Sequence, residues 1–365
     1  MPTQGKSTLT QFLIESRRRH PGATGDLNGL VTDVSLACKA IARKVAYGSL
    51  TNSLVTMDGA AQDIDGQSNE QGEEQKELDV LSNGYFLRAN EWGGHVAGMV
   101  SEELDAPYTL PPQHPRGKYL LLFDPLEGSS NMDVNVTVGS IFSVVRAITP
   151  EQDPEIEDFL QCGTEQVCAG YAIYGPTTML VLTMGNGTHA FTLDPQLGEW
   201  VLSHPNLSIP KHTREFAIDA SNARFWEPAV KRYVDECLEG STGPRGIDFN
   251  MRWIASLVAE THRILMRGGV FMYPRDTKDP SKAGRPRLLY EANPISFLIE
   301  QAGGSASTGR QRLLEVKPSS IHQRIGFIFG SSEEVARIQG YHLNEPPEPF
   351  HAPLFGHRGL FASGS

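Results

Sequence analysis

The chain has 365 residues, of which 39% are hydrophobic and 21% charged, and its formal net charge at pH 7 is −11. This length and composition predict a globular protein of one large domain or two ordinary ones. The acidic balance argues against a nucleic-acid partner, which selects a basic face, and no stretch holds the ~20 apolar residues that would cross a membrane. Four cysteines without zinc-site spacing, and an N-terminus without an apolar signal core, predict a cytoplasmic protein with reduced thiols.

The first quarter of the chain is predicted to be helical. A short helix is expected over residues 8–19, and a long amphipathic helix carries apolar residues at helical spacing from Leu30 onward. Residues 58–76 are acidic and nearly free of apolar side chains, so they predict a loop. That loop is either a solvated linker or a flap over an active site. Helical spacing resumes over residues 78–90.

The most informative stretch of the chain follows. The apolar run 119–123 predicts a buried strand, and Pro125 is expected to end it because proline lacks a backbone donor. Two carboxylates, Asp124 and Glu127, stand three residues apart at this strand end, and Asp133 follows. Taken alone, such carboxylates are also common at acidic turns on protein surfaces.

Small residues between the carboxylates favour a more specific interpretation. In Gly128-Ser129-Ser130 the backbone N–H groups can approach an anion closely and form a phosphate nest. Carboxylates beside such a nest would repel a phosphate unless a cation lay between them. Mg²⁺ binds a few carboxylates together with phosphate oxygens, so the stretch predicts metal-assisted chemistry on a phosphate ester.

Strands and helices alternate through the rest of the chain, which predicts helices packed on mixed sheets in two lobes with a site between them. Strands are expected over 134–148 and two or three more over 169–193, and the second half begins near Leu207. In this half we expect a strand at 216–219, a helix opening at 227–228, a helix over 248–267, a strand at 269–273, a strand at 288–291, a helix over 294–301 and a strand at 325–329. Proline and glycine dominate beyond Gly340, so residues 341–365 are predicted to form a frayed tail.

Several separated motifs resemble class I fructose-1,6-bisphosphatase, a family of the lithium-sensitive sugar and inositol phosphatase superfamily. The motifs are Thr-Leu-Thr-Gln-Phe-Leu at 8–13, Leu-Asp-Val-Leu-Ser-Asn at 78–83, Val-Ser-Glu-Glu at 100–103, Arg-Gly-Lys-Tyr at 116–119, Asp-Pro-Leu-Glu-Gly-Ser-Ser-Asn-Met-Asp at 124–133, Ala-Gly-Tyr at 169–171, Gly-Gly-Val-Phe-Met-Tyr-Pro at 268–274, Arg-Leu-Leu-Tyr-Glu-Ala-Asn-Pro at 287–294, Gln-Ala-Gly-Gly at 301–304 and Ile-His-Gln-Arg at 321–324. Together they extend over nearly the whole chain.

This resemblance implies an α/β fold in which α-β-α-β-α layers form a two-lobed sandwich. It implies a metal, catalytic and AMP-binding domain at residues 1–205 and a sugar-phosphate domain at residues 206–340. The implied reaction is the hydrolysis of the 1-phosphate of fructose 1,6-bisphosphate to fructose 6-phosphate, in gluconeogenesis or the Calvin cycle.

The resemblance also implies a cluster of two or three Mg²⁺ ions, for which Mn²⁺ could substitute. The implied metal residues are Glu102, Glu103, Asp124, Leu126 through its carbonyl, Glu127 and Glu291. Asp79, with Glu103, would position or deprotonate the attacking water. Glu73 would pair with Arg287 when the flap closes.

Substrate residues follow from the same resemblance. Ser129, Ser130 and Asp133 would lie beside the scissile phosphate, with Arg287 nearby. The other phosphate would meet Asn222, Arg252, Tyr273 and Arg285. Because the family supplies the equivalent of Arg252 from a neighbouring subunit, a homotetramer is implied.

An AMP effector site is the last feature that the resemblance implies. Its residues would be Thr24, Gly25, Asp26, Lys118, Tyr119 and Arg146. A glycine-containing turn that enters a helix can hold a phosphate, and lysine and arginine can pair with it. A helix cap beside ordinary surface bases is the alternative interpretation.

The chain departs from the family pattern at four positions. Glu127 stands where the family has Asp, Arg285 replaces a Lys, and Trp253 and Phe225 replace tyrosines, for which core packing is the favoured interpretation over ligand contact. These departures keep two alternatives open. One is a sedoheptulose-1,7-bisphosphatase or a dual-specificity enzyme, and the other is a non-catalytic homologue that binds sugar phosphate or AMP.

Overall fold

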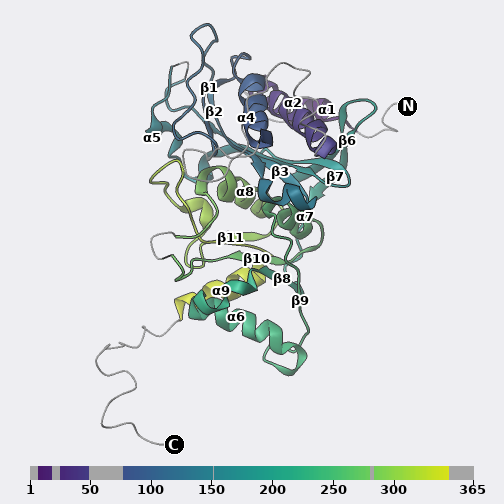
Figure 1. The fold of residues 1–365 in the computed structure, drawn as a ribbon, viewed down its shortest axis with the longest axis vertical. Coiled ribbons are helices and arrows are strands. Elements are labelled where there is room, and N and C mark those ends of the chain that lie inside the picture. The colour runs from purple at the N-terminus through teal and green to yellow at the C-terminus, as the bar shows by residue number, and fades with distance from the viewer. Residues whose placement is uncertain (1–6, 19–24, 49–76, 151, 280–282, 345–365) are drawn as a thin grey trace, which may run out of the picture.

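The computed structural model describes residues 7–18, 25–48, 77–150, 152–279 and 283–344. Two β-sheets and three helical layers alternate along the long axis of the molecule (Figure 1). This is the α-β-α-β-α sandwich that the sequence predicted. Among the described helices, none is both long and apolar enough to cross a membrane. Glu73 and Thr24, both predicted site residues, lie outside the described ranges.

The first sheet has seven strands in sequence order, and its first pair alone is parallel. Its strands are β1 (Val96–Ser101), β2 (Tyr119–Glu127), β3 (Val138–Arg146), β4 (Gln166–Tyr174), β5 (Thr178–Thr183), β6 (Thr188–Asp194) and β7 (Glu199–Leu207). Both faces of β2 are buried, because Leu121 and Phe123 pack under the outer helices while Leu120 and Leu122 face the opposite side. This two-sided burial explains the unbroken apolar run in the sequence.

Helices α1 (Leu9–Arg18), α2 (Asp26–Tyr47) and α4 (Glu77–Asn90) cover the outer face of this sheet (Figure 1). Apolar residues of α2 recur at helical spacing and are buried against the sheet, among them Leu30, Val34 and Ile41. The short helix α5 (Ile156–Phe159) lies at the β1 edge. All three outer helices agree with the predicted helical segments.

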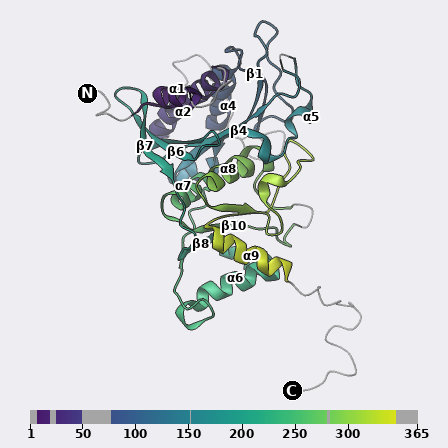
Figure 2. The same cartoon turned by 180° about the vertical axis from the view of Figure 1, so that it is seen from behind.

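The second sheet has five strands in the order β11-β12-β10-β8-β9. They are β8 (Glu215–Ile218), β9 (Asn250–Met251), β10 (Val270–Tyr273), β11 (Ser305–Ser307) and β12 (Phe327–Gly330). Helices α7 (Leu257–Arg267) and α8 (Asn293–Gln301) form the layer between the sheets, while α6 (Pro228–Glu239) and α9 (Ser332–Leu343) cover the outer face (Figure 2). Alternate residues of β10 point to opposite faces of the sheet. Phe271 packs against the middle helices, and Met272 packs against the outer helices.

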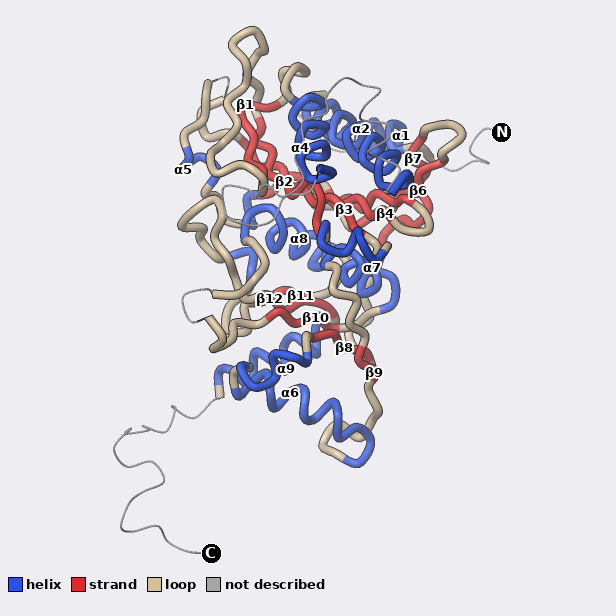
Figure 3. The backbone as a smooth tube through the Cα atoms, viewed as in Figure 1, coloured by secondary structure: helices blue, strands red, loops and turns tan. Residues whose placement is uncertain are grey.

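Two predicted elements of the second half were wrong. Residues 288–291, predicted to be a strand, form a π-helical turn, Leu288–Ala292, that continues into α8 (Figure 3). A short apolar run that is buried on all sides has no periodicity by which a strand could be distinguished from a helix. The run is followed by Pro294 at the first turn of α8, a position that favours a helix start.

The helix predicted over 248–267 begins only at Leu257. Residues Asn250–Met251 pair with β8 instead, and Ala255 has a positive φ of 60°, which no helix accepts. Ser256 then caps α7, its hydroxyl accepting the N–H of Ala259 at 3.4 Å. The apolar spacing simply continues across this break.

Two element boundaries also differ from the prediction. Residues 134–148 contain a single strand, β3, which begins at Val138. Helix α9 extends to Leu343, so residues 341–343 of the predicted frayed tail are helical. The rest of that segment, from residue 345, lies outside the described ranges.

Candidate active site

Two neighbouring strands bring the first two carboxylates to one edge of the seven-stranded sheet. Strands β1 and β2 are parallel, and Ser101 pairs with Phe123 in their register. The next residues, Glu102 and Asp124, therefore lie side by side, and the N–H of Glu102 donates to the carbonyl of Phe123 at 3.1 Å. Antiparallel strands would have sent these two ends in opposite directions.

The third carboxylate comes from the second half of the chain. Glu291 is buried in the π-helical turn and accepts the N–H of Arg287 at 2.7 Å. The Arg287 guanidinium in turn lies 3.2 Å from a Glu102 carboxylate oxygen. Carboxylate oxygens of Glu102, Asp124 and Glu291 lie within 4.8 Å of one another, which is a spacing that a divalent cation could bridge. We call these three residues the carboxylate triad.

The electrostatics of the carboxylate triad fit a cation. Asp124 Oδ1 accepts the N–H of Leu126 at 3.0 Å, whereas its buried Oδ2 has no hydrogen-bond partner among the described residues. Burial, together with the charges of Glu102 and Glu291, raises the pKa of Asp124 well above its usual range. Burial and the charge of Glu102 raise the pKa of Glu291 to about 8. Buried anions this close are stable as anions only beside a positive charge.

Glu127 lies beside the carboxylate triad but uses its carboxylate differently. Its two oxygens accept the backbone N–H groups of Leu257 at 3.1 Å and Val258 at 3.3 Å. These groups belong to the first turn of α7, where N–H donors have no partner within the helix. Burial raises the pKa of Glu127 to about 7, although the two N–H groups favour its anion. Glu127 is not one of the three residues whose oxygens converge, and its role as a metal ligand stays a prediction.

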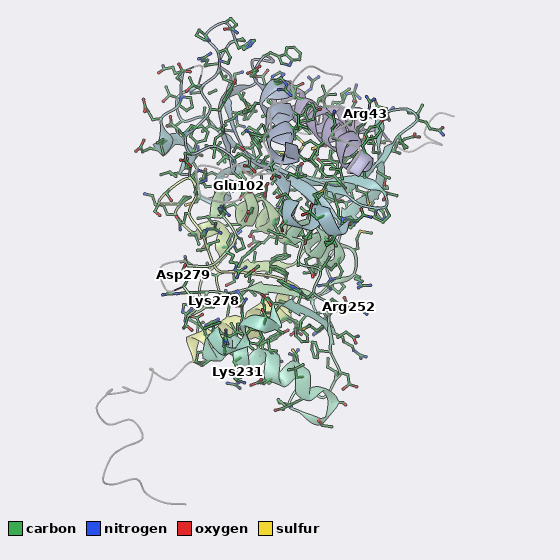
Figure 4. All side chains as sticks on the ribbon, in the orientation of Figure 1. Arg43, Glu102, Lys231, Arg252, Lys278 and Asp279 are labelled. Carbon is green, nitrogen blue, oxygen red and sulfur yellow. The ribbon has the colours of Figure 1, made fainter. Side chains whose placement is uncertain are left out.

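A cavity of about 880 Å³ opens over this cluster. It brings together most of the predicted site residues, namely Asp79, Glu102, Glu103, Asp124, Leu126, Glu127, Ser129, Ser130, Asp133, Tyr273, Arg285, Arg287 and Glu291. Figure 4 shows Glu102 at the level between the seven-stranded sheet and the middle helices. The cavity thus lies where the two halves of the chain meet.

The Gly-Ser-Ser segment forms a tight turn along one wall of the cavity. Gly128 has φ 81°, a left-handed conformation that favours glycine, and the 3-10 helix Ser129–Val134 begins directly after it. Asn131 in this helix donates from its side-chain amide to the carbonyl of Ala255 at 2.7 Å. The phosphate nest predicted here is therefore linked to the segment that precedes α7.

The opposite part of the cavity is aromatic and basic. Tyr273 is half-buried, and the Arg285 guanidinium lies 5.5 Å from its ring centre. Trp253 stacks on Phe271 at 5.8 Å and also lines the cavity, so it combines the expected packing with an exposed face toward a ligand. Phe225 does not line the cavity.

Two predicted substrate residues lie away from the cavity. Asn222 is buried, and its amide donates to Asp219 at 2.7 Å. Arg252 is half exposed and lies 3.5 Å from the Glu215 carboxylate. Figure 4 shows Arg252 beside β9, well away from Glu102. Neither side chain reaches the cavity of its own chain in this conformation.

Other residues line the cavity that the sequence did not single out as ligands. Arg324 is one, and its guanidinium donates to the carbonyl of Arg285 at 2.7 Å. The Ile-His-Gln-Arg motif at 321–324 includes Arg324, but the sequence alone does not show which residues Arg324 contacts, so the motif suggested no role for it. Asp219, Asn131 and Ser256 are further polar residues of this kind.

A second cavity of about 300 Å³ lies beside α1 and α2, and it is also lined by residues of β4 and by Phe297 of α8. Lys118, Tyr119 and Arg146 of the predicted AMP site line it, together with Arg17, which the sequence analysis missed. Asp26 does not line the cavity but pairs with Lys118 at 2.9 Å. Gly25 lies at the start of α2, next to Asp26.

Comparison with known proteins supports a single family. Residues 7–205 match the family model described as fructose-1-6-bisphosphatase, N-terminal domain, and residues 209–343 match the model for the C-terminal domain. The chain is 78% identical over 362 residues to fructose-1,6-bisphosphatase class 1 3 of Methylibium petroleiphilum, a match that covers 99% of each chain. It is 64% identical over 354 residues to fructose-1,6-bisphosphatase class 1 of Hydrogenophilus thermoluteolus, covering 97% of each.

The fold agrees with solved structures as well. The holo form of Leishmania major fructose-1,6-bisphosphatase superposes with a TM-score of 0.81 at 36% identity, covering 92% of this chain and 99% of that one. A T-state structure of the same Leishmania protein gives the same TM-score and covers 93% of this chain.

Proposed function

Because the chain belongs to the class 1 fructose-1,6-bisphosphatase family, we propose that it hydrolyses the 1-phosphate of fructose 1,6-bisphosphate to give fructose 6-phosphate and phosphate. The observation that carries the proposal is the carboxylate triad, whose oxygens converge within 4.8 Å beside the Gly128 turn. Three converging carboxylates, of which Asp124 and Glu291 are buried, suit a phosphate ester only when a cation joins them.

Mg²⁺ is the cation that the family and the oxygen ligands favour, with Mn²⁺ as a substitute. When bound, it supplies the positive charge that phosphoryl transfer needs around the attacking and leaving oxygens. The residues that would hold it are Glu102, Asp124 and Glu291. Glu103, the Leu126 carbonyl and Glu127 are further candidates, and together they could hold the two or three ions expected.

The chain's own residues would divide the remaining tasks. Asp79 and Glu103 are carboxylates on the cavity wall and would accept a proton from the attacking water. Ser129, Ser130 and the Gly128 turn would orient the scissile phosphate. Tyr273 and Arg285, across the cavity, would hold the other phosphate of the sugar.

The finer assignments belong to the same proposal. Arg252 is half exposed and is not among the residues that line the cavity of its own chain, so in a homotetramer it would serve a neighbouring subunit. The second cavity would take AMP, its phosphate held by Lys118 and Arg146. All four cysteines lie in the described ranges and are free thiols, which fits a cytoplasmic enzyme.

The direct test measures phosphate release from fructose 1,6-bisphosphate with Mg²⁺ and with Mn²⁺, for the parent chain, Glu127→Asp and Asp124→Asn. We expect activity in the parent and its near-complete loss in Asp124→Asn. If the parent releases no phosphate but Glu127→Asp does, the chain has the family's active site but has lost activity through residue 127. If neither folded protein releases phosphate, the enzymatic proposal is overturned. Relative rates on sedoheptulose 1,7-bisphosphate would measure the substrate preference.

A further inference from the structure

The Ile321-His322-Gln323-Arg324 segment carries a histidine that joins the two halves of the candidate active site. The Nε2 atom of His322 lies 3.0 Å from the carbonyl oxygen of Leu104, and its Nδ1 atom lies 2.8 Å from the hydroxyl of Tyr290. Leu104 follows the Glu102-Glu103 pair, and Tyr290 directly precedes Glu291. One imidazole thus contacts both segments that supply the carboxylate triad from opposite halves of the chain.

The hydrogen-bond partners fix the tautomer of this imidazole. A backbone carbonyl can only accept, so Nε2 of His322 carries the proton and donates to Leu104. In a neutral ring Nδ1 then accepts, and the Tyr290 hydroxyl is the donor. Burial lowers the pKa of His322, which keeps the ring neutral at neutral pH. His322 therefore donates one hydrogen bond to Leu104 and accepts one from Tyr290, and the two roles cannot be exchanged.

The segment that holds His322 is itself anchored to the Glu291 side. The N–H of Leu288 donates to the carbonyl of Gln323 at 2.7 Å, and Arg287 pairs with Arg324 in a β-bridge. Two contacts of this unit then reach across to the Glu102 side: the Arg287–Glu102 ion pair and the bond from His322 to the backbone of Leu104. The Tyr290 hydroxyl fixes the orientation in which the ring makes that bond.

We propose that His322 is a positioning residue that sets the distance between the Glu102 and Glu291 carboxylates, and so sets the affinity of the site for its divalent cation. The proposal rests on the metal role of the carboxylate triad in the proposed function. A metal site tolerates little error in ligand placement, and groups that orient its ligands typically change affinity by about 10–100-fold when removed. His322 is not among the residues that line the cavity, and it acts through the Leu104 carbonyl and the Tyr290 hydroxyl.

The chain contains a matched control for this arrangement. Tyr171 donates or accepts a hydrogen bond with Nδ1 of His262 at 2.9 Å, and burial lowers the pKa of His262 as it does that of His322. Both rings in each pair also meet edge to face. Neither Tyr171 nor His262 lines the active-site cavity. The Tyr171–His262 pair therefore has the same hydrogen bond and ring contact as Tyr290–His322 but does not lie beside the carboxylate triad.

The test compares His322→Phe, His322→Gln and Tyr290→Phe with Tyr171→Phe, using the full chain. Mn²⁺ affinity is measured by calorimetry in the absence of substrate, and kcat and KM are measured at saturating metal. We expect His322→Phe to weaken Mn²⁺ binding by about 10–100-fold. His322→Gln, which keeps a donor near the Nε2 position, should recover part of the loss, and Tyr290→Phe should lose a smaller part.

Tyr171→Phe should lower the melting temperature as Tyr290→Phe does but leave Mn²⁺ affinity within twofold of the parent. Equal Mn²⁺ affinities in Tyr290→Phe and Tyr171→Phe, with His322→Gln no better than His322→Phe, would overturn the proposal. Both tyrosine variants remove one hydroxyl, so the test holds even if His322→Phe fails to fold. Mn²⁺ binding is read without sugar phosphate, so a parent that binds Mn²⁺ but releases no phosphate would refute the proposed function and leave this inference standing.

Discussion

The active-site cavity and the cavity beside α1 and α2 carry opposite charge. The larger is lined by the carboxylates of Asp79, Glu102, Glu103, Asp124, Glu127, Asp133, Asp219 and Glu291, with arginines at one side. The smaller is lined by Arg17, Lys118 and Arg146, and no carboxylate is among its described lining residues. A phosphate can enter the smaller cavity directly, whereas in the larger one it would meet anions.

This difference teaches where a metal is needed. In the basic cavity the protein itself supplies the positive charge for a phosphate. In the acidic cavity the carboxylates outnumber the arginines, so on the proposed function a divalent cation adds the positive charge that a phosphate beside the carboxylate triad needs. Variants that change the charge of either cavity should therefore affect different measurements.

The largest effect is expected at the centre of the acidic cavity. Asp124→Asn removes the most buried charge of the carboxylate triad, and the lost stabilisation of several kcal/mol should lower phosphate release by about 10³-fold. The same variant should raise the melting temperature of the metal-free protein, because asparagine is neutral, whereas the buried Asp124 carboxyl must either bind a proton or stay charged beside two other carboxylates. Asp235→Asn, on the exposed surface of α6, is the control for both assays. A metal-free protein that is less stable than the parent would contradict this account of the triad.

Metal-free protein should also lose stability as the pH rises from about 4.5 to 8. The pKa of Glu127 is raised from 4.5 to about 7 and that of Glu291 to about 8. The folded state therefore keeps protons that the unfolded state has released, so the free energy of unfolding falls with pH in this window. Mg²⁺ at 100 times its Kd should add about 2.7 kcal/mol and release protons on binding.

Thermal melts at pH 5 and pH 8.5, with and without Mg²⁺, measure how the stability depends on pH and on the metal. Calorimetry in two buffers of different ionisation enthalpy measures the protons that are released when Mg²⁺ binds. A Mg²⁺ shift of equal size at both pH values would argue against buried, protonated carboxylates.

An intermediate effect is expected in the basic cavity. Arg146→Ala and Lys118→Ala each remove a charged donor, and a hydrogen bond to a charged group is worth about 1.5–3 kcal/mol. AMP affinity, measured by calorimetry, should fall by about 10–100-fold in each variant. Arg285→Ala, in the acidic cavity, should leave AMP affinity unchanged. No AMP binding by the parent at millimolar concentration would exclude the effector role.

The smallest effect is expected at Glu127. In Glu127→Asp the shorter side chain cannot span to the N–H groups of Leu257 and Val258, which should cost about 1 kcal/mol of stability, as the loss of a helix cap does. Glu127→Gln keeps the length and one acceptor, so it should retain more of that stability. Chemical denaturation of the three metal-free proteins measures the difference. Equal stability of Glu127→Asp and the parent would show that the α7 contacts contribute nothing.

The residues alone predicted helices packed on mixed sheets in two lobes, whereas the α-β-α-β-α order and most residues of the acidic cavity came from the family resemblance. Strand β2 is apolar on both faces and ends in Asp124, so its place and its carboxylate followed from the residues alone. The division into domains at residue 205 and the site roles carried from the family resemblance stay predictions.

Other features depended on contacts that a sequence does not display. The π-helical turn at Glu291 was mistaken for a strand, because five buried residues have no informative period. The extra methylene of Glu127 suggested a poorer metal ligand, but its carboxylate meets the first turn of α7, 130 positions later in the chain. The roles of Arg17 and Arg324 could not be inferred either, since each is meaningful only beside residues distant in sequence.

The carboxylate triad also has a consequence for synthesis on the ribosome. Glu291 lies 167 residues after Asp124, and at about 5–20 residues per second it emerges roughly 8–33 s later. During that interval the nascent chain holds Glu102 and Asp124 without the third carboxylate or the arginine that pairs with Glu102. On the proposed metal role, metal binding is therefore a late event of biogenesis, and a chain truncated before residue 287 would hold the whole first sheet but lack Arg287 and Glu291.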